Sequence, residues 1–287
     1  MHQTLNLPII DAHVHVMTNE RIASGMRWLS RYLPGTDVDT DMHVEKALNM
    51  LSDAGVDYYF NFFYPIFPGT TEEVNRWSYQ LSLRDRRAIP FASLLPADPD
   101  KLRLLDQAFD EYNFLGVKLH PYVQKFSIKD PRLHEVYAYL QELNRPVVIH
   151  SGYENVYSTT SNREEILWLL NKYPNLTVVS PHLFYPDLGA AFKLLEIYPR
   201  VYLDATNVFY SLIEDKPLED WWEKFNQFSE RIYFGTDFTM GMAFPARLYQ
   251  QFAELPLTLK AREDLLFRTA WNFAKKFGRT LKLPQVD

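Results

Sequence analysis

The sequence predicts an α/β fold, a single (β/α)8 barrel. Short runs of β-branched or aromatic residues alternate with longer segments of helical period from one end of the chain to the other, and eight such runs occur. No Ser/Gly linker or composition shift divides the 287 residues. We therefore expect one domain over residues 1–287.

The eight predicted strands are 8–16, 57–63, 89–94, 116–119, 146–149, 176–180, 201–205 and 231–235. Strands separated by single helices pair in parallel through right-handed crossovers, and eight such units are what a closed barrel requires. The alternative is an open doubly wound sheet. It usually has fewer strands, and no Gly-rich phosphate loop follows the first strand here.

Between the strands, apolar residues recur at the i, i+3, i+4, i+7 spacing of amphipathic helices. The stripes are Val44, Ala47, Leu48, Leu51; Leu133, Val136, Tyr137, Leu140; Ile166, Leu169, Leu170, Tyr173; and Leu188, Ala191, Phe192, Leu195. Asp187 is available as an N-cap, and Ser161 with Glu164 has the spacing of a capping box. Gly55 stands where a helix should end.

Composition excludes several classes of function. The chain carries 30 basic and 36 acidic residues with no basic run, so nucleic acid is not an expected partner. There is no cysteine, which excludes thiolate ligands and cysteine nucleophiles. No uncharged stretch reaches the roughly 18 to 20 apolar residues that span a bilayer, and no targeting signal opens the chain. We expect a soluble, cytoplasmic protein without a membrane partner that acts on a small molecule, with a homo-oligomer left open.

Residues suited to metal chemistry end five of the predicted strands. They are His13 and His15, Lys118 and His120, His150, His182, and Asp237. In a parallel barrel the chemistry gathers at the carboxyl ends of the strands. Five of the eight histidines lie there, so the pattern predicts a metal site. The alternatives are hydrogen-bonded core histidines and, for Asp237, a helix N-cap.

His13 and His15 share one face of their strand because side chains alternate with period two. Imidazole nitrogen and carboxylate oxygen suit zinc, and three or four protein ligands with an open position describe a catalytic site. His13, His15, His150 and Asp237 could supply that set. Water in the open position would have its pKa lowered from about 16 toward about 7, which gives a hydroxide nucleophile.

Several motifs resemble the amidohydrolase superfamily: Asp-Ala-His-Val-His (11–15), Gly-Val-Lys-Leu-His-Pro (116–121), Pro-Val-Val-Ile-His-Ser-Gly (146–152), Pro-His-Leu (181–183) and Phe-Gly-Thr-Asp (234–237). The Lys-Leu-His-Pro stretch with Gln124 downstream, and Trp-Asn-Phe-Ala at 271–274, resemble its amidohydrolase-related (amidohydrolase 2) branch. That branch of metal-dependent barrels includes hydrolases of C–N and C–O bonds and decarboxylases of small aromatic or unsaturated acids.

The resemblance implies roles for particular residues. His13, His15, His150 and Asp237 would bind the metal, His182 would polarise the substrate or shuttle a proton, and Asp237 would double as base. The chain departs from many relatives at Leu183-Phe184-Tyr185 and at Phe238-Thr239-Met240.

Lys118 and His120 also share one face of their strand. Lys118 could be carboxylated and bridge a second metal ion, pair with a substrate carboxylate, or be a buried structural cation. His120 could touch substrate or orient a neighbour by hydrogen bonding. One ion is favoured, with two if Lys118 is carboxylated.

The segment 17–41, which follows the first strand, is expected to be a long loop and a candidate substrate lid. It carries Arg21, Arg27 and Arg31, which could hold an anionic group; a solvated charged loop is the alternative.

The leading hypothesis is a metal-dependent hydrolase of an amide, lactone or ester bond in a small substrate, carboxylated or not. Zinc is the expected ion, and manganese, iron and cobalt also accept these ligands. The first alternative is a metal-dependent decarboxylase. The second is a barrel that binds a ligand without turnover.

Overall fold

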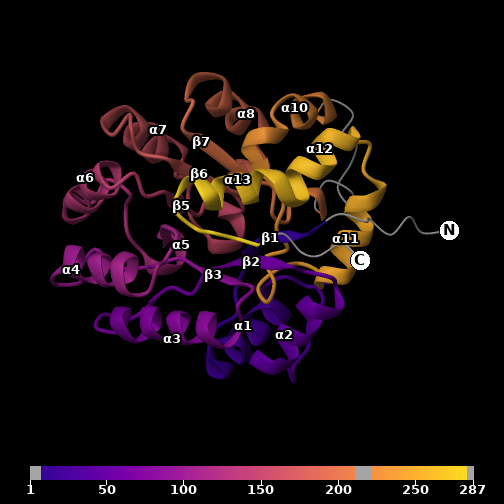
Figure 1. Ribbon diagram of the computed structural model, residues 1–287, viewed down its shortest axis with the longest axis horizontal. Helices are drawn as coiled ribbons and strands as arrows, with labels where there is room; N and C mark the ends of the chain where they lie inside the picture. Colours follow the sequence, from indigo (N-terminus) through magenta and orange to yellow (C-terminus); the bar gives the residue numbers. More distant parts are fainter. Residues whose placement is uncertain (1–7, 211–220, 283–287) are drawn as a thin grey trace. The chain divides into compact units, whose positions relative to one another are not determined.

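The computed structural model describes residues 8–210 and 221–282, in which strands and helices alternate along the chain (Figure 1). The strands are β1 (Ile10–Val14), β2 (Tyr58–Asn61), β3 (Ala88–Pro90), β4 (Val117–Leu119), β5 (Val147–Ile149), β6 (Val178–Pro181), β7 (Val201–Asp204) and β8 (Ile232–Tyr233). Every predicted strand is present within these described residues, in a shorter form.

The larger helices follow the same order. They are α1 (Asn19–Tyr32), α2 (Val44–Asp53), α3 (Thr71–Arg84), α4 (Lys101–Asp106), α5 (Pro121–Gln124), α6 (His134–Glu142), α7 (Arg163–Lys172), α8 (Leu188–Ile197), α10 (Trp222–Gln227), α11 (Pro245–Glu254), α12 (Leu259–Glu263) and α13 (Thr269–Lys276). Single π-helical turns extend α4 over Gln107–Glu111 and α12 over Asp264–Arg268.

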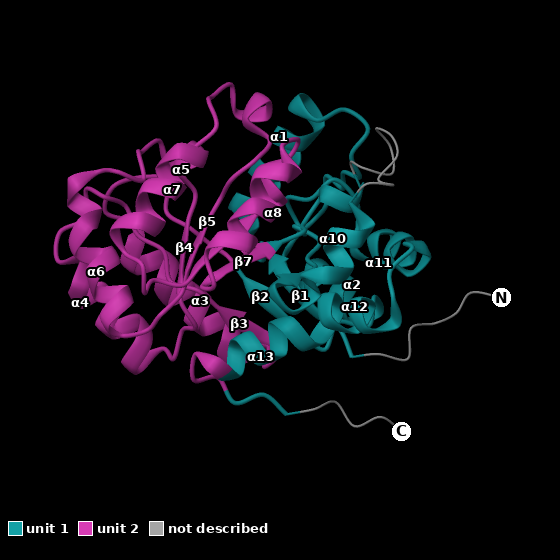
Figure 2. Ribbon diagram, turned by 90° about the horizontal axis from the view of Figure 1, so that it is seen from above, with its two compact units in different colours: residues 1–61, 204–275, 280–287 teal, residues 62–203, 276–279 magenta. Residues whose placement is uncertain are grey.

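The chain divides into two compact units (Figure 2). Unit 1 comprises residues 1–61, 204–275 and 280–287, and unit 2 comprises residues 62–203 and 276–279. The prediction of one domain over 1–287 stays a prediction.

In unit 1 the first strand lies between the second and the last. β1 pairs in parallel with β2, with Ile10 opposite Tyr58. On its other side the Ala12 N–H donates to the Phe234 carbonyl (3.0 Å) and the Asp237 N–H donates to the His13 carbonyl (2.8 Å). Pairing of a first strand with a last one is what a closed barrel requires.

In unit 2 successive strands pair in parallel. β4 pairs with β5 and β5 with β6, with Val147 opposite both Val117 and Val178. The Lys118 N–H donates to the Ala92 carbonyl (2.7 Å), which sets the residues after β3 beside β4. All of β4, β5 and β6 is buried, as expected of parallel strands covered on both faces.

The predicted helical stripes are the buried faces of α2, α6, α7 and α8. Asp187 caps α8 by accepting from the Ala190 N–H (3.2 Å), and Gly55 follows α2 with φ 77°. The predicted capping box is wrong. Helix α7 begins after Asn162, whose side chain turns inward and donates to the His150 carbonyl (2.8 Å) instead of capping the helix.

The segment 17–41 is not the long loop that we predicted, because α1 occupies its first half. Thr18 caps this helix, and Ile22, Met26 and Leu29 form a buried stripe at positions i, i+4 and i+7. The predicted loop rested on the length of the segment and its place after the first strand, and it overlooked this apolar stripe.

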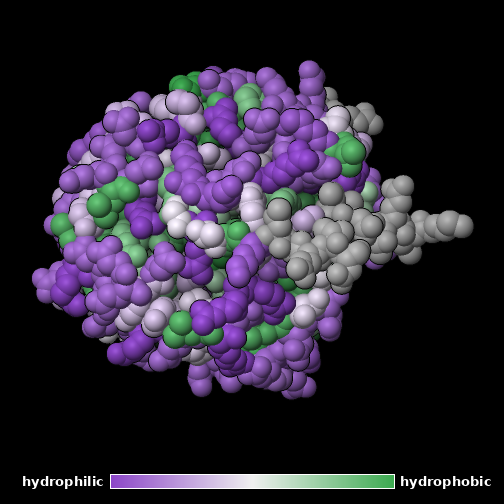
Figure 3. Space-filling view, in the orientation of Figure 1, coloured by the Kyte–Doolittle hydropathy of each residue, from purple (hydrophilic) through white to green (hydrophobic). Residues whose placement is uncertain are grey.

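None of the described helices is long and apolar enough to cross a membrane. On the face drawn in Figure 3 most surface residues are hydrophilic, and hydrophobic residues form small separate patches.

Candidate metal centre

Three ligand atoms of unit 1 converge at the ends of β1 and β8. His13 Nε2 lies 3.2 Å from His15 Nε2, and Asp237 Oδ1 lies 3.4 Å from the first and 3.0 Å from the second. All three residues are buried. The period of β1 turns His13 and His15 to one side, and the pairing of β1 with the chain after β8 brings Asp237 to them.

The spacing of these atoms fits a divalent cation. Ligand atoms that lie roughly 2.0–2.1 Å from a tetrahedral zinc ion are about 3.3 Å from one another. The three observed separations fall close to that value. Two imidazoles and a carboxylate are also the donor types that zinc, manganese, iron and cobalt accept, so the residues present fit such an ion.

Asp204, the last residue of β7, orients His13. Its Oδ2 lies 2.5 Å from His13 Nδ1, and its Oδ1 accepts from the Thr206 N–H (3.0 Å) and the Thr206 hydroxyl. Both Asp204 and His13 are fully buried. The contact places a proton on Nδ1 and turns the Nε2 lone pair toward His15 and Asp237, as in carboxylate–histidine–metal triads.

Asp237 is fixed by contacts on three sides. Its Oδ2 accepts from Asn207 Nδ2 (2.7 Å), its N–H donates to His13, and its carbonyl accepts from the Met240 N–H (2.6 Å). Its φ is 61°, in the left-handed region that few residues other than glycine adopt. At Gly241 an added Cβ would lie 2.2 Å from the Thr236 carbonyl oxygen. Backbone strain such as the left-handed conformation of Asp237 persists where the surrounding structure enforces it, commonly at functional sites.

Asp11 holds β1 to the segment that carries Asp237. Its Oδ1 accepts from the N–H groups of His13 (3.2 Å) and Thr236 (2.9 Å), and its Oδ2 accepts from the Thr236 hydroxyl (2.6 Å) and the Tyr249 hydroxyl (3.0 Å). Complete burial raises the pKa of this carboxyl from 3.8 to about 6, although each of these hydrogen bonds acts to lower it.

Unit 2 gathers three histidines of its own. The ring of His150, which follows β5, stacks on His120 with centroids 3.8 Å apart and an angle of 14° between the planes. The ring of His182 lies 4.6 Å from that of His150. All three are buried. Tyr122 and Tyr157 pack edge-on against His150 at 5.4 and 5.3 Å.

Gln124 ties together the chain segments that lead into this cluster. Its Oε1 accepts from the His120 N–H (2.7 Å), and its Nε2 donates to the carbonyls of Pro65 (3.0 Å) and Leu94 (3.1 Å). Those carbonyls follow β2 and β3. Gln124 therefore fixes the backbone of His120 relative to the two segments that carry these carbonyls.

Lys118 is fully buried, and its Nζ lies 4.6 Å from the centroid of the Phe62 ring. This is a cation–π geometry. The three roles that the sequence leaves open for Lys118 stay predictions.

His182 begins a strained turn. His182, Leu183 and Phe184 have φ of 61°, 49° and 52°, three successive left-handed residues without a glycine. The turn lies against Gly152, where an added Cβ would be 2.8 Å from the Tyr185 backbone nitrogen. The close approach explains the glycine in the His-Ser-Gly motif.

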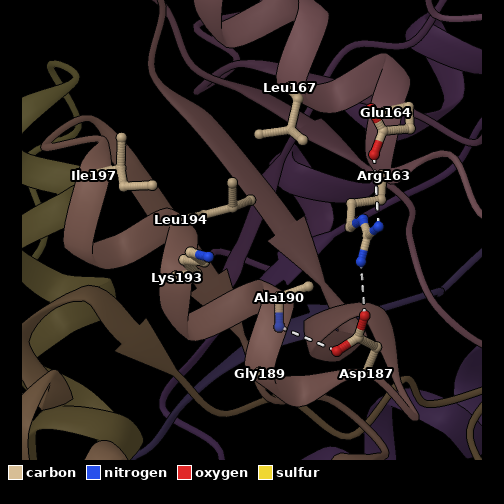
Figure 4. Close-up of a pocket in the computed structure, with 9 residues that line it drawn as sticks. All are labelled: Arg163, Glu164, Leu167, Asp187, Gly189, Ala190, Lys193, Leu194 and Ile197. Atoms are coloured by element: carbon tan, nitrogen blue, oxygen red, sulfur yellow. Dashed lines mark hydrogen bonds and ion pairs between the residues drawn. The ribbon is translucent and has the colours of Figure 1, made fainter.

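Unit 2 also contains a groove of about 500 Å³ between α7 and α8, lined by Arg163, Glu164, Leu167, Asp187, Gly189, Ala190, Lys193, Leu194 and Ile197 (Figure 4). Asp187 pairs there with Arg163 (2.8 Å). None of the predicted site residues lines this groove.

The structure therefore brings His13, His15 and Asp237 together in unit 1, and His120, His150 and His182 in unit 2. His150 as fourth ligand of the ion stays a prediction. Sequence reasoning missed Asp204 and Asn207. The signal for Asp204 was present, because it is an acidic residue at the carboxyl end of the seventh strand.

The family model described as amidohydrolase matches residues 10–271. A search of curated proteins finds no match to the chain. Among solved structures, an uncharacterised TIM-barrel protein from Bordetella bronchiseptica is similar, with 21% identity, a TM-score of 0.74, and coverage of 95% of this chain and 100% of that one.

Two further solved structures are similar over most of their length. One is a 5-carboxyvanillate decarboxylase from Novosphingobium aromaticivorans with bound manganese, at 13% identity and a TM-score of 0.70, covering 94% and 97% of the two chains. The other is a putative amidohydrolase from Staphylococcus aureus, at 12% identity and a TM-score of 0.67, covering 94% and 100%. These likenesses confirm the (β/α)8 barrel fold.

Proposed function

The chain belongs to the metal-dependent amidohydrolase family, and from that membership we propose that it is a metal-dependent hydrolase of an amide, lactone or ester bond in a small substrate. The observation that carries the proposal is the triangle formed by His13 Nε2, His15 Nε2 and Asp237 Oδ1. Three buried donor atoms at this spacing are suited to one cation.

His13, His15 and Asp237 would hold the ion, and His150 is the proposed fourth ligand. His150 directly follows β5, and barrel enzymes build their sites from residues at the carboxyl ends of several strands. A divalent ion supplies Lewis-acid chemistry and lowers the pKa of water. We propose zinc from the ligand types; the manganese in the decarboxylase structure supports that ion as the alternative.

The other proposed roles are those of the base, of the group that polarises the substrate, and of the residue that orients His150. Asp237 is the proposed base, since Asn207 engages only Oδ2 and Oδ1 lies among the metal-binding atoms. His182 is the proposed group that polarises the substrate or moves a proton, and its left-handed backbone supports a constrained position. His120 is proposed to orient His150, against which it stacks.

A second candidate is decarboxylation of a small aromatic or unsaturated acid. The observation that favours it is the similarity of the fold to a 5-carboxyvanillate decarboxylase at a TM-score of 0.70. In that reaction a C–C bond to the carboxylate breaks and no water is added, so the products separate the two candidates.

The test begins with metal analysis of protein purified without chelator, before and after reconstitution with zinc or manganese. We expect stoichiometric metal in the wild type and its loss in His13→Ala. The matched control is His43→Ala, because His43 is exposed and its ring nitrogen Nδ1 bonds to the Asp41 carbonyl (2.9 Å), which belongs to none of the proposed ligands. Repeated absence of metal from the wild type, or full occupancy in His13→Ala, would overturn the metalloenzyme proposal.

The metal-loaded enzyme is then assayed on panels of esters, lactones, amides and aromatic carboxylic acids in ¹⁸O-labelled water. Incorporation of ¹⁸O into a product acid supports hydrolysis. Release of CO₂ without incorporation would replace it with the decarboxylase.

A further inference from the structure

Asn207 uses the two ends of its side-chain amide to join the candidate metal ligand Asp237 to a neighbouring loop. Its Nδ2 donates to Asp237 Oδ2 (2.7 Å), and its Oδ1 accepts from the Met242 N–H (3.3 Å). The residue is 7% exposed and has φ 62°. Asparagine is among the few side chains that tolerate this left-handed backbone.

The same loop is held from its far side by Asp37, in the segment that follows α1. The Asp37 N–H donates to the Met242 carbonyl (3.0 Å), and Asp37 Oδ2 accepts from the Phe244 N–H (2.9 Å). Asp37 Oδ1 also lies 3.4 Å from Arg247 Nη1. A continuous series of hydrogen bonds thus runs from Asp37 through Met242 and Asn207 to Asp237, all within unit 1.

We propose that Asn207 is a positioning residue for Asp237 and that Asp37 acts on the metal site through it. A carboxylate can turn about its Cβ–Cγ bond, and the bond from Asn207 to Oδ2 stops that rotation. Oδ1 then stays 3.4 and 3.0 Å from His13 Nε2 and His15 Nε2. Groups that orient metal ligands in this way raise metal affinity because the ligands are fixed before the ion arrives.

The segment 33–43 thus has a role different from that of a substrate lid. Asp37 fastens this segment to residues 242–247, and Asn207 connects Met242 to a ligand of the proposed site. Loosening the segment should therefore change how tightly the ion is held, although Asp37 itself touches none of the ligands in these contacts. The inference rests on the proposed metal site.

The first test is Asn207→Gly, which removes both side-chain bonds and is compatible with φ 62°. The dissociation constant for Zn²⁺ is measured by chelator competition, and the visible absorption of the Co²⁺-loaded protein reports ligand geometry. We expect affinity 10- to 100-fold weaker, on the order found for residues that orient ligands, with an altered Co²⁺ spectrum. The matched control is Asn113→Gly, because Asn113 is exposed, has φ 54° and serves Arg279 through its carbonyl alone.

If Asn207→Gly does not fold, Asn207→Asp replaces it. An aspartate tolerates the same backbone and still accepts from Met242, but it cannot donate to Asp237 when ionised. We expect it also to change the Co²⁺ spectrum. An unchanged spectrum and unchanged Zn²⁺ affinity in the variant that folds would overturn the role of Asn207.

The second test is a double-mutant cycle with Asp37→Ala, which removes the side-chain bonds that fasten residues 242–247 through the Phe244 N–H and Arg247 and leaves the backbone bond to Met242 in place. In the wild-type background we expect Zn²⁺ affinity several-fold weaker, and in the Asn207→Gly background no further loss, because the two residues lie on one path. The control is Asp39→Ala, two residues away, since Asp39 pairs with Lys46 (2.5 Å) in α2 and not with the loop. Equal losses from Asp37→Ala in both backgrounds would overturn the path.

These outcomes separate the inference from the proposed function. Absence of metal from the wild type overturns the proposed function, and the inference with it. Metal bound equally well by the wild type and Asn207→Gly overturns the inference and leaves the proposed function standing.

Discussion

Replacing Asp11 with asparagine tests what it costs to bury a carboxyl group between the strands that carry His13 and Asp237. Asp11 is completely buried, and burial raises its pKa from 3.8 to about 6 in spite of four accepted hydrogen bonds. The variant keeps the size of the side chain and removes the titration. The free energy of unfolding of the wild type, relative to that of Asp11→Asn, should therefore depend on pH.

The sign follows from proton binding. The folded chain holds the proton of Asp11 more tightly than the unfolded chain, so the stabilising contribution is full below about pH 3.8 and is lost as the pH rises through about 6. One pKa unit corresponds to about 1.4 kcal/mol. The rise to about 6 therefore corresponds to about 3 kcal/mol in total, of which about 1 kcal/mol is lost between pH 5 and pH 7.

The assay is urea unfolding of both proteins at pH 5, 6 and 7 in the presence of a chelator. We expect the stability of the wild type relative to Asp11→Asn to fall by about 1 kcal/mol from pH 5 to pH 7. Tyr249, in α11, is the other buried titratable group bonded to Asp11, and burial raises its pKa well above 10, so it stays protonated over this range.

The control is Asp130→Asn. Hydrogen bonding to Arg132 lowers the pKa of Asp130 below 3.8, so its titration is complete below pH 5 and its difference from the wild type should be flat. A flat difference for Asp11→Asn, or one that rises with pH, would refute the argument from burial.

Two further substitutions act on the same strands. Asp204→Asn keeps the shape of the side chain that bonds to His13 but weakens the bond to Nδ1, so the affinity for Zn²⁺, measured by chelator competition, should fall about 10- to 100-fold. The control Asp187→Asn, at the N-cap of α8, should leave that affinity unchanged. An equal loss in both variants would contradict the role of Asp204 in orienting His13. Gly235→Ala would place a Cβ 2.6 Å from His13 Cβ and 2.7 Å from His13 N, so urea unfolding should show a loss of about 1–3 kcal/mol together with loss of metal. The control Gly278→Ala, at φ 87° after α13, should lower the free energy of unfolding without loss of metal. Retention of metal by Gly235→Ala would contradict the prediction and show that β1 moves to make room for the added Cβ.

The strands and most helices could be predicted because their signal is local. A buried parallel strand is apolar along its length, as β5 is, and a helix that packs on one side repeats its apolar residues, as α2 does. The ends of the elements were less predictable. At α7 the sequence offers Ser161 as a cap, yet Asn162 precedes the helix, and its side chain donates to the His150 carbonyl, a tertiary contact.

Some residues of the candidate site could likewise be predicted from local sequence, and others could not. His13 and His15 could be predicted because their spacing and the period of a strand put both side chains on one face. Asp237 could be predicted because it follows the last strand in a family motif. Asp204 could not be assigned to His13 from spacing, because 191 residues separate them and only the packing of the strands brings the carboxylate to Nδ1.

The positions to which the sequence patterns assigned no role are those that set the geometry of the ligands. Asp204 fixes the ring of His13, and Asn207 fixes the carboxylate of Asp237. Asp11 fixes the backbone of β1 to that of Thr236, next to Asp237. None of the three lies in the triangle of ligand atoms, and one of them, Asp11, is held as a buried carboxyl at a cost of about 3 kcal/mol at neutral pH. An apolar residue in its place would leave the four donors that bond to Asp11 without an acceptor. With four donors directed at it, the carboxyl group of Asp11 holds β1 in register against Thr236 and so aligns His13 with Asp237.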